Sequence, residues 1–229
     1  MMELRPGQLV RSRKAWAAFC AGLALALFLV ARSGSPSMVR AFDALKHGGH
    51  MLEADFERIA KFKAVLLESA RESGVDPYVL AGIMYNESRG VGGQTSSAGA
   101  MGLMQLSQAA ANDAAKRLKL PEPKPEDLLT NSALNIRLAA SHWAWLMKHR
   151  GDWTEEAVLV SYNAGRTKLN RWIESSGSYA KWCESEVRAE AQGKKTTGAL
   201  RYARNCQQIA RLMREKGLLE TAPKAEKLP

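Results

Sequence analysis

Residues 76–105 read DPYVLAGIMYNESRGVGGQTSSAGAMGLMQ, and the rest of the chain is best understood from this stretch. It opens with Asp76 and Pro77, a pair typical of a helix N-terminus, and continues as a largely apolar run that ends at Glu87. A segment rich in glycine and small residues follows. A carboxylate at the end of an apolar helix is poorly solvated, and desolvation raises its pKa. We therefore predict that Glu87 holds its proton near neutral pH and can act as a general acid.

The rest of the folded part is also predicted to be helical. Apolar residues recur at helical spacing before Asp76, in a run that ends at Gly74. Ser107 can cap another helix that extends to Leu118. Further helical runs follow at residues 133–148, 154–162 and 200–216. The sequence shows no strand pattern of useful length, so the predicted fold class is mainly α.

An apolar segment precedes this helical body. Residues 15–31 form a 17-residue run without a charged residue, which is at the short end for a membrane-spanning helix. Basic residues lie before the run, so residues 1–14 are expected to stay in the cytoplasm and the remainder to be exported. We interpret the run as an uncleaved transmembrane anchor. A cleaved signal peptide and a buried core helix are the alternatives.

The chain is accordingly predicted to have five parts. They are a basic cytoplasmic N-terminus (1–14), the anchor or signal segment (15–31), a linker (32–50), a helical domain (51–217) and a disordered tail (218–229). The body after the apolar run carries a net charge of about +7, which favours anionic partners. This charge is dispersed among acids, and the sequence has no zinc-finger or RNA-binding signature, so nucleic acid is not an expected partner.

The cysteines and histidines give no sign of a metal site. Cys20 lies in the apolar segment, whereas Cys183 and Cys206 would both reach an oxidising compartment if the body is exported. They are a candidate disulfide pair, and two buried free thiols are the alternative. The four histidines are scattered along the chain, so neither a metal nor another cofactor is expected.

Four short segments occur in a fixed order along the body: YNES (85–88), SAGAMGLMQ (97–105), NI (135–136) and SYNAG (161–165). In this order and spacing they resemble the soluble lytic transglycosylase (SLT) family, whose members are relatives of goose-type lysozyme. The resemblance covers about residues 55–210. It implies a lysozyme-like helical domain, here with one N-terminal membrane or signal helix.

The resemblance also implies an activity. Enzymes of this family cleave the β-1,4 bond between N-acetylmuramic acid and N-acetylglucosamine in peptidoglycan, and they form a 1,6-anhydromuramyl product without water or metal. One glutamate acts first as acid and then as base, and the resemblance assigns this role to Glu87. It assigns substrate binding to Ser88, Met104, Gln105, Tyr162, Asn163 and Tyr202.

The binding residues have different expected roles. Met104 and Gln105 would line the sugar groove, and Ser88 would bond near the acetamido group or the acid. Tyr162 and Asn163 would face Glu87 across the cleft. Glycines of the loop, Gly99 and Gly102, would let its backbone approach the saccharide.

The sequence departs from the family pattern in two places. The family often has proline after Y-N-A-G, where this chain has Arg166. The family also often has a later E-T-R-x-Y-V segment, of which only Tyr202 has a counterpart here.

Residues 88–112 contain no Asp or Glu, whereas goose-type lysozymes carry aspartates there to position a water molecule. This favours intramolecular cyclisation over hydrolysis. Asp152 or Glu155 could still supply a second carboxylate, so a muramidase that uses water is an alternative. A non-catalytic glycan-binding scaffold is another.

The expected location follows from the substrate, because peptidoglycan lies outside the cytoplasmic membrane. We expect a single-pass protein of the bacterial inner membrane with its catalytic domain in the periplasm. The expected partners are glycan strands, the inner membrane and a secretion, conjugation or other envelope machine.

Overall fold

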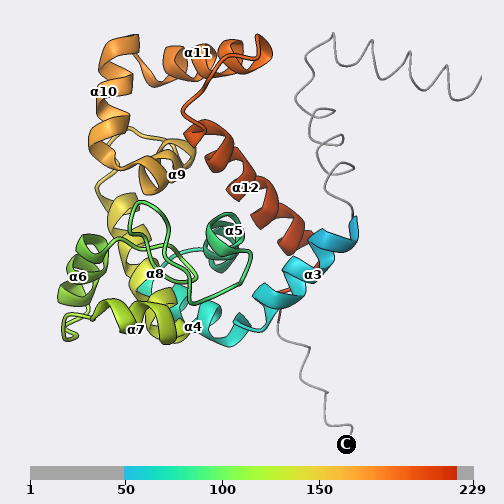
Figure 1. Cartoon of the computed structure of the whole chain (residues 1–229), viewed down its shortest axis with the longest axis vertical. Coiled ribbons are helices and arrows are strands. Elements are labelled where there is room, and N and C mark those ends of the chain that lie inside the picture. The colour runs from blue at the N-terminus through green and yellow to red at the C-terminus, as the bar shows by residue number, and fades with distance from the viewer. Residues whose placement is uncertain (1–48, 221–229) are drawn as a thin grey trace, which may run out of the picture. The chain divides into compact units, whose positions relative to one another are not determined.

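The computed structural model describes residues 49–220, and this part of the chain is mainly helical, as predicted. Its helices are α3 (Gly49–Ala60), α4 (Lys63–Ser73), α5 (Pro77–Ser88), α6 (Gln108–Arg117), α7 (Pro125–Thr130), α8 (Ser132–Lys148), α9 (Glu155–Ala164), α10 (Arg166–Ser176), α11 (Tyr179–Ala191) and α12 (Ala199–Glu215) (Figure 1). No strand occurs among the described residues. Two isolated β-bridges, Thr95–Met101 and Met101–Leu106, lie in the loop between α5 and α6.

Helix α5 supplies much of the core. It begins as predicted, with the Asp76 carboxylate accepting a hydrogen bond from the Tyr78 amide at 2.9 Å and Pro77 in the first position. Its buried side chains are Tyr78, Val79, Leu80, Ala81, Ile83, Met84 and Ser88. Burial on all sides explains why this helix has no polar stripe. It packs against α4 and α12 (Figure 1).

The contact between α5 and α12 requires a glycine. A Cβ atom at Gly82 would lie 2.4 Å from the backbone oxygen of Cys206. Any larger residue at Gly82 would push the two helices apart. This close contact matters because α12 carries Tyr202 towards the end of α5.

The glycine-rich loop is held by one buried asparagine. The side chain of Asn135 in α8 is 0% exposed, donates to the backbone oxygens of Met101 (3.1 Å) and Leu128 (3.2 Å), and accepts from the Met104 amide (2.9 Å). A Cβ atom at Gly102 would lie 2.2 Å from the Leu128 oxygen, so packing requires a glycine at this position, and the expected approach of the saccharide stays a prediction. A Cβ atom at Gly99 would meet no other atom within 4 Å.

Several predictions fall outside the described residues. They include the N-terminus (1–14), the anchor or signal segment (15–31) and most of the linker (32–50) and tail (218–229). No helix among residues 49–220 has the length and apolar character needed to cross a membrane. The domain bounds of 51–217 remain a prediction.

Candidate active site

Glu87 lies in the last turn of α5 and is half-buried. Burial raises the pKa of its carboxyl group to about 7, the direction expected from the sequence. The hydroxyl group of Tyr202 donates a hydrogen bond to Glu87 Oε1 at 2.7 Å, which stabilises the carboxylate and offsets part of this rise. The side chain is therefore poised to exchange a proton near neutral pH, and its orientation is fixed by one tyrosine.

Tyr162, from α9, is the second tyrosine at this site. Its hydroxyl group donates to the backbone oxygen of Met104 at 3.0 Å. Burial and the nearby charge of Glu87 both raise the pKa of Tyr162, which places the two side chains within electrostatic reach of each other. The structure thus brings Glu87, Tyr162 and Tyr202 together from three helices.

Ser88 does not face the acid. Its side chain is buried and its hydroxyl group donates to the backbone oxygen of Leu103 at 2.7 Å, while accepting from the Gly90 amide at 3.2 Å. This differs from the predicted contact with the acetamido group or the acid, because the hydroxyl proton is committed to the backbone. Ser88 instead ties the glycine-rich loop to the end of α5.

The remaining predicted binding residues differ in exposure. The Met104 side chain is 0% exposed, so it belongs to the core here and presents no surface to a sugar. Gln105 is half-buried with φ 46°, and its side-chain amide donates to the backbone oxygens of Gly102 (2.9 Å) and Gln94 (3.2 Å). Asn163 is exposed at the end of α9.

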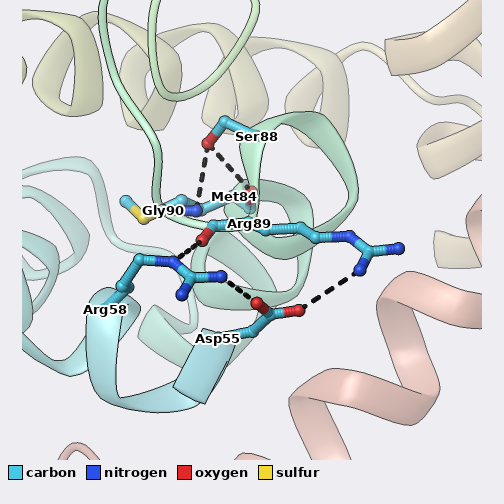
Figure 2. A network of polar contacts seen from close by, with 6 residues as sticks. All are labelled: Asp55, Arg58, Met84, Ser88, Arg89 and Gly90. Atoms are coloured by element: carbon cyan, nitrogen blue, oxygen red, sulfur yellow. Dashed lines mark hydrogen bonds and ion pairs between the residues drawn. The ribbon is translucent and has the colours of Figure 1, made fainter. Parts of the chain in front are cut away.

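Sequence reasoning missed a polar network directly after Glu87. Asp55 in α3 is 3% exposed and forms ion pairs with Arg58 and with Arg89, the latter at 3.5 Å (Figure 2). Arg58 Nε also donates to the backbone oxygen of Arg89 at 3.1 Å. Arg89 is the left-handed C-cap of α5, with φ 51°. The network therefore fixes the backbone at Arg89, two residues after Glu87. The feature of the sequence that could have indicated it is Asp55, an acidic residue between apolar neighbours.

Cys183 and Cys206 are free thiols in this structure. Cys206 is buried beside Asn86, whose side-chain nitrogen lies 3.2 Å from the sulfur, and burial raises the pKa of this thiol. Cys183 is half-buried near Glu156 on α11. Of the two alternatives left by the sequence, the structure contains the unpaired one.

The two carboxylates considered as partners of Glu87 do not contribute to its shifted pKa. Burial and the Tyr202 hydroxyl are the causes of that shift. Asp152 is exposed, and Glu155 accepts a hydrogen bond from Gln207 at 3.4 Å. Among the described residues, no group of three or more His, Cys, Asp or Glu side chains is placed to hold a metal ion.

A comparison with known protein families shows which family this chain belongs to. The sequence profile of the transglycosylase SLT domain matches residues 65–185, which is more than half of the chain. The chain belongs to the transglycosylase SLT domain family. The SLT match includes Glu87 and Tyr162 but leaves out α3 and α12, which supply Asp55 and Tyr202.

The individual proteins that the chain matches share limited sequence identity with it. The chain is 36% identical over 83 residues to a protein named lysozyme g from Takifugu rubripes, an alignment that covers 32% of this chain and 44% of the fish protein. The SLT fold is shared with the lytic transglycosylase Slt of Pseudomonas aeruginosa, solved as an inactive glutamate-to-glutamine mutant (21% identity, TM-score 0.56, 67% of this chain and 24% of that one). It is also shared with the 70 kDa soluble lytic transglycosylase of Escherichia coli, which is 20% identical with a TM-score of 0.54. This match covers 70% of this chain and 26% of that one. The chain thus spans less than half of the length of each of these relatives.

Proposed function

We propose that this chain is a peptidoglycan lytic transglycosylase in which Glu87 is the catalytic acid and base. The observation that carries the proposal is a half-buried glutamate with a pKa of about 7, oriented by Tyr202 within the SLT fold. A pKa near the working pH suits a group that must both give and take a proton. In the solved relative from Pseudomonas aeruginosa, an inactive mutant likewise carries glutamine in place of a glutamate.

The proposed reaction has two proton transfers. Protonated Glu87 gives its proton to the bridging oxygen between N-acetylmuramic acid and N-acetylglucosamine, and the bond from this oxygen to C1 of the muramyl sugar breaks. The resulting carboxylate takes the proton of the muramyl 6-hydroxyl group as its oxygen attacks C1. The products are a free N-acetylglucosamine end and a 1,6-anhydromuramyl end, and Glu87 is protonated again.

The glycan strand would lie against Glu87, Tyr162, Gln105 and Asn163. The Tyr202 hydroxyl group would hold the carboxylate in place during both transfers, because its hydrogen bond is strongest to the charged form. Ser88 and the Asp55 network would keep the end of α5 in position. Met104 would act through its backbone, which links the loop to Asn135 and Tyr162.

A muramidase that uses water is the second candidate. The similarity to a protein named lysozyme g favours it. The absence of Asp and Glu from residues 88–112 favours the transglycosylase, because hydrolysis needs a group to position the water.

Product analysis separates the two reactions. The full chain is incubated with purified peptidoglycan, and the soluble fragments are identified by mass spectrometry. We expect 1,6-anhydromuramyl ends, which are lighter than reducing muramyl ends by the mass of one water molecule because no water is added. Reducing ends as the main product would contradict the transglycosylase and support the muramidase.

We further propose that the chain is anchored in the bacterial inner membrane by residues 15–31, with the domain in the periplasm. The basic residues before this apolar run support this orientation. Attachment would confine cleavage to peptidoglycan close to the membrane, where a secretion, conjugation or other envelope machine needs an opening.

A further inference from the structure

A cluster of indole rings and arginines lies next to the proposed active site. We call it the indole–arginine cluster, and it consists of Arg117 at the end of α6, Trp145 in α8, Trp153 before α9, and Arg166 at the start of α10. The guanidinium carbon of Arg166 lies 4.8 Å from the centre of the Trp153 ring and 5.7 Å from that of Trp145. The guanidinium carbon of Arg117 lies 5.5 Å from the centre of the Trp145 ring. The two cations share one indole and are therefore at most about 11 Å apart.

Neither arginine has a carboxylate partner among residues 49–220. Arg214 shows the contrast, because it lies 4.8 Å from the ring of Tyr78 but also pairs with Asp76. Nη1 of Arg166 is buried without a hydrogen-bond partner. The charge of Asp113 acts on Arg117, yet the two form no ion pair. Two like charges held near one another without an ion-pair partner favour the binding of an anion.

The cluster is connected to the site through His142 and Tyr162. The ring of His142 lies 6.3 Å from that of Trp145 and 5.6 Å from that of Tyr162. Burial and the charge of Arg117 lower the pKa of His142 to about 4, so the imidazole is neutral at physiological pH. The positive charge at this position therefore comes from the arginines.

We propose that the indole–arginine cluster binds a carboxylate of the peptide attached to the muramyl sugars. This inference rests on the proposed function. On a strand that carries its peptides, the lactyl carboxyl group of each muramyl sugar is bound in an amide, so the anionic groups near the cleaved bond belong to the peptides. A guanidinium group matches the two oxygens of a carboxylate, and the indole rings shield part of it from water. An extended peptide of four or five residues spans roughly 15 Å, enough to reach beyond the residues that hold the sugars.

Arg166 is the residue of this subsite that differs from the family pattern. It stands where the family often has proline, and it occupies the first position of α10. Proline is well tolerated at the first position of a helix, so Arg166→Pro removes the charge without a penalty for the backbone. Arg166→Gln removes the charge and keeps most of the side-chain length.

Two forms of the same substrate test the subsite. One is uncrosslinked glycan strands that carry their peptides, and the other is the same strands after the carboxylates of these peptides have been chemically amidated. We expect Arg166→Gln and Arg166→Pro to lower kcat/KM about tenfold or more on the peptide-bearing strands. This decrease corresponds to the loss of one charge-assisted hydrogen bond. Cleavage of the amidated strands should stay within about twofold of the parent chain, because these strands offer the cluster no carboxylate.

Arg150→Gln is the matched control, because Arg150 is an exposed arginine near the end of α8 that is outside the cluster. It should leave both rates unchanged if the effect is local and not a result of net charge. An equal loss on both substrates, or no loss on either, in the Arg166 variants would overturn the proposal.

A binding measurement separates this inference from the catalytic one. In a Glu87→Gln background, calorimetry with a peptide-bearing muropeptide reads the subsite without turnover. We expect Arg166→Gln to weaken this binding about tenfold and to leave unchanged the binding of the same muropeptide with its peptide carboxylates amidated. Equal affinity for the muropeptide with and without Arg166 would refute the subsite, whatever the products of the parent enzyme are.

Discussion

The character of Glu87 results from two opposing effects. Burial raises the pKa of its carboxyl group to about 7, and the hydrogen bond from Tyr202 limits this rise. An acid catalyst must be protonated when it meets the substrate. Activity is therefore expected to fall as the pH rises through about 7, where Glu87 loses its proton.

The substitution Tyr202→Phe tests this balance. It removes a hydrogen bond that stabilises the carboxylate, so the pKa of Glu87 should rise and the loss of activity should move to higher pH. The rate at the optimum should fall between about tenfold and a hundredfold, because the acid is less well oriented. The pH dependence of kcat/KM gives both results.

Tyr179→Phe is the control for this experiment. Tyr179 donates to the carboxylate of Glu156 at 3.0 Å, which is a similar contact remote from Glu87. Its pH profile should match that of the parent chain. A profile of Tyr202→Phe that keeps its position, or moves to lower pH, would show that the hydroxyl group does not control the acid.

The residues of the site were predictable to different degrees. Glu87 and its raised pKa followed from an isolated acid at the end of an apolar helix. Tyr202 rested on a single matching residue, because nothing in a sequence shows that a helix 115 residues away returns to the acid. The inward orientation of Ser88 and Met104 could not be predicted, since it depends on how the loop folds back onto α8.

At the scale of elements, the end of α5 and the following loop form one rigid support. Ser88 holds the loop from α5, Asn135 holds it from α8, and the Asp55 network holds the helix cap from α3. Helices α5, α6, α8, α9 and α12 and the caps at Asp76 and Ser107 were predictable from local patterns, whereas α7, α10 and α11 were not predicted and the run before Gly74 is divided into α3 and α4. The loop was not, because its conformation depends on contacts between residues distant in the sequence.

Two glycines of this loop provide a matched pair of variants. Gly99 and Gly102 have φ values of 79° and 76°, so alanine at either position adds similar backbone strain, about 1–2 kcal/mol. At Gly102 the added methyl group would also meet the Leu128 oxygen and the Asn135 side chain. We expect Gly102→Ala to lower the free energy of unfolding by about 2 kcal/mol more than Gly99→Ala. Urea denaturation of both variants measures this, and equal losses would contradict the role of packing.

At the scale of the whole molecule, the SLT match covers residues 65–185 and the site extends beyond it. Helices α3 and α12 flank the matched region and contribute Asp55, Arg58 and Tyr202. The family resemblance therefore predicted the fold and the position of the acid. The supporting contacts of α3 could not be inferred from the family motifs, because they lie outside them.

The proposed anchor gives a prediction at this scale. The full chain should remain in the membrane fraction after washing with high salt, and a chain that starts at residue 32 should not. An apolar helix of 17 residues is held by burial in the bilayer, which salt does not weaken. Recovery of the full chain in the periplasmic fraction, shortened near residue 31, would instead indicate a cleaved signal peptide.

The substitution Glu87→Gln tests the central claim most directly. Glutamine keeps the shape of the side chain but cannot give up a proton, so release of soluble fragments from purified peptidoglycan should fall on the order of a hundredfold or more. Glu57→Gln, at an exposed glutamate of α3, is the control and should retain full activity. Peptidoglycan cleavage by the Glu87→Gln chain at the rate of the parent would contradict the account.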